Sequence, residues 1–276
     1  FTDNTTSKSL TVNDLLGTAY AKCELYGEKD GTWSIVDKST KIAELTGYTA
    51  YKVQFPECVH QCADDSNPVC SVCHKKLYTK ITAKAADGTT KTAYFTEDSA
   101  LENGYVEAIQ TLNGWSNEGC TEPTLTLLRD MYAYGTSMPL TGTLTLKGGT
   151  HTATNVTVAK NADVTFASGS YKGATIDGTA TVKEGVTFTD ASVEVNGTLN
   201  AKGGTFTGNV KFNGSSIANI SGGSFNNEKK YGGVTFDYNV TGTITGGTFT
   251  FADFYTTKGK LSGGTFTIIK SNGDRK

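Results

Sequence analysis

The second half of the chain repeats a short pattern of apolar and polar positions. An apolar residue is followed two positions later by a Gly-Gly or similar corner, and then by a Thr-aromatic or similar pair. The apolar positions are Leu146, Phe166, Val182, Ile220, Ile244 and Leu261, and the closing aromatics are Tyr171, Phe188, Phe206, Phe225, Phe249 and Phe266. Successive aromatics are 17, 18, 19, 24 and 17 residues apart. Such near-regular spacing predicts stacked structural repeats.

Each repeat predicts a strand, a glycine corner and a second strand, because glycine turns the backbone without a Cβ clash. The two-residue period of a strand places the aromatic inside and the preceding threonine outside. We therefore predict a mainly β fold, a right-handed parallel β-helix in which the aromatics form an internal ladder. An antiparallel sandwich is the alternative, since Asn196-Gly197 and Asn213-Gly214 supply the closely spaced turns of that architecture.

The remaining sequence predicts smaller elements ahead of the solenoid. Strand-like runs cover 18–26, 31–36 and 47–55, with Trp33, Tyr48, Tyr51 and Phe55 as their core. Alternation over 77–85 and 89–95 around Asp87-Gly88 predicts a hairpin, and a helix follows from 96 to about 112, ending at Asn113-Gly114. We divide the chain into a small β or α+β region (1–56), a Cys/His knuckle (57–77), the hairpin and capping helix (78–120), and the parallel β-helix (121–276).

The knuckle carries the clearest chemistry. Cys58-Val-His60 and Cys70-Ser-Val-Cys73 each present two ligands of the kind that zinc prefers, so Cys58, His60, Cys70 and Cys73 are candidate ligands of a structural zinc ion. The first pair can equally be Cys58 and Cys62.

Two other interpretations of the cysteines remain open. Six cysteines permit three disulfides, with Cys23 and Cys120 far from the cluster in sequence. Cys70 to His74 also matches the attachment motif of a c-type haem, but the sequence offers only two methionines and no helical pocket around them.

Composition narrows the function classes. A net charge of −2 with 19% charged residues gives no electrostatic case for nucleic acid or an anionic membrane. No apolar run is long enough to span a bilayer. The sequence starts at Phe1 without the basic start and apolar core of a signal peptide, so we expect any export signal or anchor to lie outside it.

The order of these motifs resembles a known group of proteins. The Cys/His knuckle, the hairpin with a central Asp-Gly, the short helix and the Gly-Gly-Thr-Phe repeats together resemble the modular surface proteins of Gram-positive, especially gut, bacteria. Those proteins share the pectate-lyase-like β-helix fold and mostly act as adhesins or host-protein binders, some of them for immunoglobulins. The resemblance covers residues 58–276 and implies zinc at Cys58, His60, Cys70 and Cys73, but it leaves Cys62 unexplained.

Enzymatic relatives of this fold cleave acidic polysaccharides, which requires paired carboxylates or a base beside a cation. Between 145 and 270 the sequence has one histidine, His151, and no arginine. Asp177 and Glu194 are 17 residues apart and could align on neighbouring coils, although solvated surface positions explain them more simply. We therefore expect no enzyme; a polysaccharide lyase or glycoside hydrolase is the alternative.

The sequence thus predicts a monomeric, non-catalytic binding module that is secreted or held at the bacterial cell surface. Its expected partner is a host protein such as immunoglobulin, or a host glycan or mucin, bound on the lateral face of the solenoid. Tyr231, Tyr238, Phe254 and Tyr255 are the candidate contacts, because aromatic residues are enriched in binding hot spots. A purely structural stalk is the other alternative.

Overall fold

The structure is a computed structural model that describes residues 10–17, 23–54, 58–96, 104–129, 138–189, 192–226, 233–250, 252–254 and 258–266. It divides into two compact units. The N-terminal unit comprises residues 1–61 and 70–74, and the solenoid unit comprises residues 62–69 and 75–276. Each is described by itself below.

The N-terminal unit is a three-stranded antiparallel sheet with a short helix. Its elements are α1 (Val12–Leu16), β1 (Glu24–Lys29), β2 (Thr32–Val36), the 3-10 turn η3 (Ile42–Glu44) and β3 (Ala50–Gln54). The strand order is β2-β1-β3. Thr11 and Asp14 form a reciprocal capping box at the start of α1, which explains why so short a helix begins there.

The core of this unit differs from the predicted one. Val12 and Leu16 of α1 pack with Leu25 and Val36 of the sheet, and Tyr48 packs against this cluster. Of the expected core residues, Trp33 and Tyr51 are instead 39% and 43% exposed, whereas Phe55 lies outside the described residues. The prediction for Trp33 was wrong because a three-stranded sheet with one helix can bury only one of its faces, and Trp33 lies on the other.

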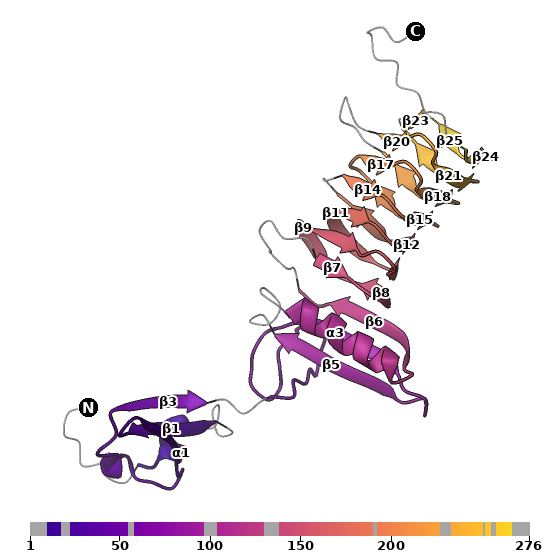
Figure 1. The fold of residues 1–276 in the computed structure, drawn as a ribbon. Helices are drawn as coiled ribbons and strands as arrows, with labels where there is room; N and C mark the ends of the chain where they lie inside the picture. The colour runs from indigo at the N-terminus through magenta and orange to yellow at the C-terminus, as the bar shows by residue number, and fades with distance from the viewer. Residues whose placement is uncertain are drawn as a thin grey trace, which may run out of the picture. The chain divides into compact units, whose positions relative to one another are not determined.

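The solenoid unit opens with the predicted hairpin, formed by β4 (Leu77–Lys84) and β5 (Thr90–Thr96). The helix α3 (Gly104–Asn117) packs on β4, β5 and β6 (Thr121–Leu127), as Figure 1 shows. The helix does not end at Asn113-Gly114 as predicted. It continues through Gly114 to Asn117, and Gly119 ends it with a φ of 86°, a backbone conformation that favours glycine.

One long sheet runs from the hairpin to the last coil. It has ten strands in the order β24-β21-β18-β15-β12-β10-β8-β6-β4-β5. The strands that follow β6 are β8 (Thr143–Lys147), β10 (Asp163–Phe166), β12 (Thr179–Val182), β15 (Thr198–Ala201), β18 (Ile217–Ile220), β21 (Thr241–Ile244) and β24 (Lys260–Leu261). Each of these pairs in parallel with its neighbours, so the antiparallel sandwich is excluded for this part of the chain.

The other side of the coils forms a sheet of twelve strands, also parallel. Its members are β7 (Met138–Leu140), β9 (Thr150–Val158), β11 (Gly169–Ile176), β13 (Val186–Phe188), β14 (Val193–Val195), β16 (Thr205–Phe206), β17 (Val210–Phe212), β19 (Ser224–Phe225), β20 (Val234–Phe236), β22 (Thr248–Phe249), β23 (Ala252–Phe254) and β25 (Thr265–Phe266). The two sheets together form a parallel β-solenoid of about 6 turns, which confirms the predicted fold class.

The predicted aromatic ladder is present inside the solenoid. The ring centroids of successive members from Tyr171 to Phe266 lie between 4.5 and 5.6 Å apart. A second stack, Phe212 on Phe236 at 4.9 Å, was not predicted. The sequence repeat hides it because the equivalent position one coil earlier is Val195 rather than an aromatic residue.

Candidate metal centre

Two short segments of the N-terminal unit meet at the Cys/His cluster. The backbone N–H of Ser71 donates to the Gln61 carbonyl at 2.9 Å, which holds the segment after Cys58 and His60 against the Cys-x-x-Cys turn. That turn closes through the His74 N–H, which donates to the Cys70 carbonyl at 2.9 Å. His74 has a φ of 58°, so the chain reverses direction immediately after Cys73.

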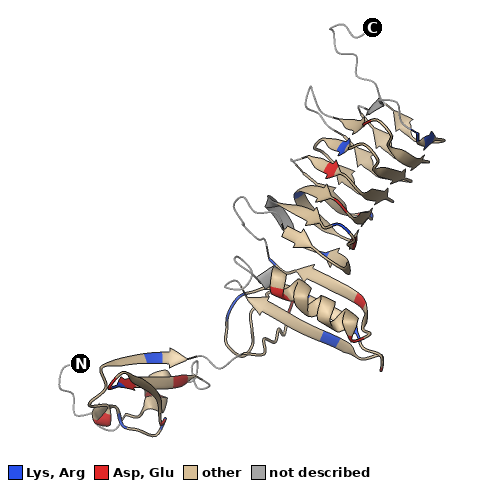
Figure 2. Ribbon diagram, viewed as in Figure 1, with Lys and Arg blue, Asp and Glu red and all other residues tan. Residues whose placement is uncertain are grey.

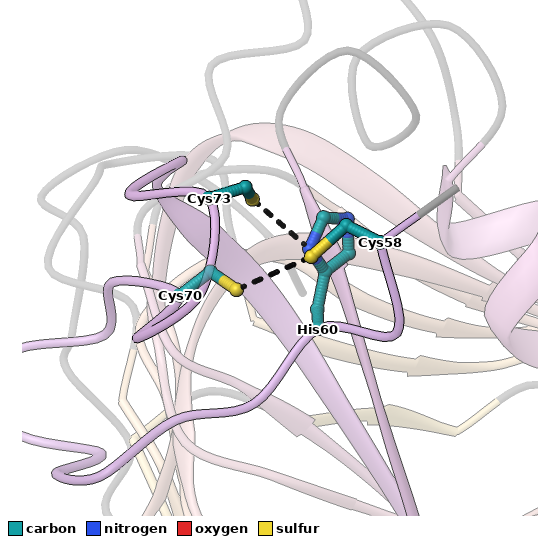
Figure 3. Close-up of side chains that lie close together, drawn as sticks. All are labelled: Cys58, His60, Cys70 and Cys73. Carbon is teal, nitrogen blue, oxygen red and sulfur yellow. Dashed lines mark hydrogen bonds between the residues drawn. The ribbon is translucent and has the colours of Figure 1, made fainter. Parts of the chain in front are cut away.

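Cys58, His60, Cys70 and Cys73 turn their side chains toward one another, as Figure 3 shows. One ligand atom from each lies within 4.8 Å of the others. The Sγ atoms of Cys58 and Cys70 are 3.7 Å apart, and Cys73 Sγ lies 3.4 Å from His60 Nδ1. Cys70 is buried and the other three are half-buried. This cluster could therefore bind a metal ion.

Two of the separations between these ligand atoms fit a tetrahedral ion. With bonds of about 2.3 Å to sulfur and about 2.0 Å to nitrogen, a tetrahedron has S···S edges of about 3.8 Å and S···N edges of about 3.5 Å. The observed 3.7 and 3.4 Å agree with these edges. A disulfide would instead require about 2.05 Å between sulfurs, and all six cysteines are free thiols.

The thiols of this cluster differ in acidity. Burial, together with hydrogen bonds to Cys73 and Cys70, raises the pKa of Cys58 to about 12. Burial also acts to raise the pKa of Cys70, but backbone hydrogen bonds, among them the Val72 N–H at 3.4 Å, outweigh it and lower that pKa to about 6. Cys70 thus loses its proton more readily than Cys58, and thiolate is the form that binds metal.

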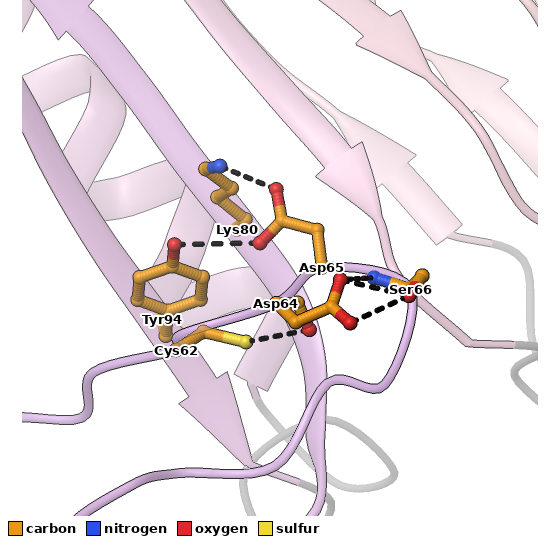
Figure 4. A network of polar contacts seen from close by, with 6 residues as sticks. All are labelled: Cys62, Asp64, Asp65, Ser66, Lys80 and Tyr94. Carbon is orange, nitrogen blue, oxygen red and sulfur yellow. Dashed lines mark hydrogen bonds and ion pairs between the residues drawn. The ribbon is translucent and has the colours of Figure 1, made fainter.

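Cys62 is not a member of the cluster. Its thiol donates to the Asp64 carbonyl at 3.2 Å, in a polar network drawn in Figure 4. In the same network the Lys80 ammonium lies 2.5 Å from the Asp65 carboxylate, and Tyr94 donates to that carboxylate at 3.4 Å. Of the two ligand pairs that the sequence allowed, the structure therefore brings Cys58 and His60, not Cys58 and Cys62, to Cys70 and Cys73.

The two remaining cysteines and the aromatic residues predicted to contact a partner lie away from this cluster or outside the described residues. Cys23 and Cys120 are buried free thiols, one in each unit. Tyr238 is 58% exposed, whereas Tyr231 and Tyr255 lie outside the described residues and Phe254 is described only through the pairing of its backbone with Phe236.

The carboxylates considered for catalysis do not face each other. Glu194 is aligned with Thr175 on the preceding coil, not with Asp177. Asp177 instead accepts a hydrogen bond of 2.7 Å from Asn196, which in turn accepts one of 2.7 Å from Asn213. Asp177 therefore belongs to a ladder of turn residues. This ladder was not predicted, although Asn-Gly recurs at 196 and at 213.

No protein-family model, curated protein or solved structure matches this chain. Within the described residues, no helix has the length and apolar character needed to cross a membrane.

Proposed function

We propose that Cys58, His60, Cys70 and Cys73 bind one structural zinc ion. Three thiols and one imidazole are the soft and borderline donors that zinc prefers over magnesium or calcium. Four protein ligands fill a tetrahedral ion and leave no position for water or substrate, which is the arrangement of a structural site rather than a catalytic one. The observation that carries this proposal is the convergence of the four ligand atoms within 4.8 Å.

Zinc content of the purified chain tests this proposal. We expect one zinc ion per chain for the wild type. In a thiol titration, the three ligand cysteines, Cys58, Cys70 and Cys73, should be protected before a chelator is added and should react after it is added. The direct comparison is Cys70→Ser with Cys62→Ser. The first variant should lose zinc, whereas the second should retain it because Cys62 lies outside the cluster.

We further propose that the chain is a non-catalytic binding module of the bacterial cell surface, acting through the lateral face of the solenoid. A packed aromatic stack inside parallel coils makes a rigid rod whose outer side chains are free to contact a partner. The resemblance to modular surface proteins supports a host protein such as immunoglobulin, or a mucin glycan, as that partner.

Binding to immobilised immunoglobulin and mucin tests this second proposal. Saturable binding to one of them, reduced when Tyr231 and Tyr238 are both changed to Ala, is the expected result. A polysaccharide lyase or hydrolase would instead depolymerise an acidic polysaccharide, and a purely structural stalk would do neither.

A further inference from the structure

Three Asn-Gly pairs lie wholly within the described residues, at 113–114, 196–197 and 213–214. This dipeptide deamidates more readily than other asparagine pairs, because glycine has no Cβ to shield its amide nitrogen from the asparagine side chain. The reaction requires that nitrogen to be free of a hydrogen bond and the backbone around it to be able to turn. The three pairs therefore differ in reactivity according to what the fold does to each glycine N–H.

The pair at 113–114 is held in a helix. Gly114 lies inside α3, which continues to Asn117, and in a helix the N–H of an interior residue donates to the carbonyl four residues earlier. The amide of Asn113 is held as well, because its Nδ2 donates to Thr141 Oγ1 at 3.1 Å. The helix thus protects this pair.

The pair at 196–197 is held by the preceding coil. The Gly197 N–H donates to the Ile176 carbonyl at 2.8 Å. A Cβ on Gly197 would lie 2.1 Å from a carbonyl oxygen of that coil, so the backbone has no room to turn. Both ends of the Asn196 amide are also engaged, since Nδ2 donates to Asp177 and Oδ1 accepts from Asn213, each at 2.7 Å. This pair is protected although the Asn196 side chain is exposed.

The pair at 213–214 lies in an exposed turn. The Ser216 N–H closes the turn by donating to the Asn213 carbonyl at 3.1 Å, and Ser215 has a φ of 69°. In the part of the chain that the structure describes, the Gly214 N–H has no hydrogen-bond acceptor. A Cβ on Gly214 would meet only the Tyr238 carbonyl oxygen, at 3.1 Å. The nucleophilic nitrogen is therefore free at this pair alone of the three.

We infer that Asn213 is a site of spontaneous deamidation in the folded protein, whereas Asn113 and Asn196 are protected. The Gly214 nitrogen gives its proton to a base in solution and attacks Asn213 Cγ. A new N–Cγ bond forms, the Cγ–Nδ2 bond breaks, and Nδ2 takes up a proton and leaves as ammonia. Water then adds to one carbonyl carbon of the cyclic succinimide and breaks its bond to nitrogen, which leaves aspartate or isoaspartate. The reaction consumes one water molecule and needs no oxidant or enzyme.

The product differs from the asparagine in hydrogen bonding and in charge. A carboxylate in place of the Asn213 amide cannot donate the hydrogen bond to Asn196 Oδ1, and it adds a negative charge to the ladder that ends at Asp177. Figure 2 shows how sparsely charged side chains occur on the solenoid strands. The net charge of −2 becomes one unit more negative, so anion exchange should separate the two forms.

Peptide mapping of the folded full chain, kept at mildly alkaline pH and sampled over time, tests the inference. Tryptic cleavage after Lys183, Lys202 and Lys211 puts Asn196 and Asn213 into separate peptides, whose masses report each conversion independently. The same incubation in urea gives the rate of each residue in the unfolded chain. Relative to its own rate in urea, folded-state conversion of Asn213 should be about tenfold faster than that of Asn196, because one hydrogen bond fewer must break.

The matched variant is Gly214→Ala, whose methyl group hinders the attacking nitrogen. It should slow the conversion of Asn213 and leave that of Asn196 unchanged. Measuring the variant in urea as well keeps this comparison valid even if its fold is weakened. Equal relative rates at Asn196 and Asn213, an unreactive Asn213 in the folded wild type, or a Gly214→Ala rate equal to that of the wild type overturns the inference.

Discussion

The rings of Phe206 and Phe225 lie parallel inside the solenoid, with centroids 4.5 Å apart and planes 3° from parallel. Strand pairing of β16 with β19 places the two residues directly opposite each other, so the ring separation follows the spacing of the strands. Because a ring in the middle of the stack touches neighbours on both sides, its removal leaves a cavity that the rigid coils cannot close.

Phe206→Ala should therefore lower the free energy of unfolding by about 3–5 kcal/mol. Phe266, at the end of the same stack and 36% exposed, is the matched control, and its change to Ala should cost about 1 kcal/mol or less. Urea unfolding of the two variants measures both values. Equal losses would contradict a continuous buried stack.

The glycine corner predicts a contrast between two glycine substitutions. A Cβ on Gly223 would lie 2.8 Å from the Gly203 carbonyl oxygen, and its φ of 100° is unfavourable for any other residue. Gly223→Ala should cost about 2 kcal/mol. Gly114 lies in α3 with no atom near its added Cβ, so Gly114→Ala should stabilise by about 0.5–1 kcal/mol. The same sign of effect for both, measured by thermal unfolding, would refute this explanation.

The metal centre predicts a coupling between zinc and the stability of the N-terminal unit. Removing a structural ion breaks the bonds that join three thiols and an imidazole through it, and the free energy of those bonds is lost from the folded state. Chelation should therefore lower the unfolding temperature of the wild type and of Cys62→Ser, but should leave Cys70→Ser unchanged because that variant already lacks the ion. Circular dichroism with and without chelator measures this. A Cys70→Ser protein that still responds to chelation would count against the assigned ligands.

The carboxylate of Asp14 should stabilise the folded chain near neutral pH and should cease to do so in acid. The backbone N–H of Thr11, and then its hydroxyl, donate to this carboxylate and lower its pKa in the folded chain. A lowered folded pKa means that the contribution is fully present above the unfolded pKa of about 3.9 and is lost as pH falls through the folded value. The stability difference between wild type and Asp14→Asn should thus shrink as pH falls below about 4, as urea titrations at several pH values can show. A stability difference between the two proteins that grows as the pH falls would contradict this prediction.

Much of the fold could be predicted from the sequence because its repeats are regular. Each Phe of the ladder follows a Gly-Gly or similar corner at nearly constant spacing, which fixes both the coil and the inward face. The error at Trp33 has a different origin. An aromatic residue in an alternating strand indicates a face but not whether that face is covered. In the small sheet, α1 and Tyr48 cover the face opposite to that of Trp33.

The members of the Cys/His cluster could be predicted only in part. The Cys-x-x-Cys motif identifies Cys70 and Cys73 as one pair of candidate ligands. The other pair could be either Cys58 with His60 or Cys58 with Cys62, because both spacings are compatible with one metal ion. Which of the two pairs faces Cys70 and Cys73 depends on how the segment from Cys58 to Cys62 runs past the Cys-x-x-Cys turn. The hydrogen bond from the Ser71 N–H to the Gln61 carbonyl fixes that course, and the sequence alone does not reveal this bond.

Binding of the full chain to immobilised immunoglobulin and to mucin, recorded together with an assay for cleavage of polygalacturonate, tests the central claim most directly. A non-catalytic binding module predicts saturable binding to one of the two surfaces and no release of cleavage products. Cleavage of the polysaccharide without saturable binding to either surface would contradict it.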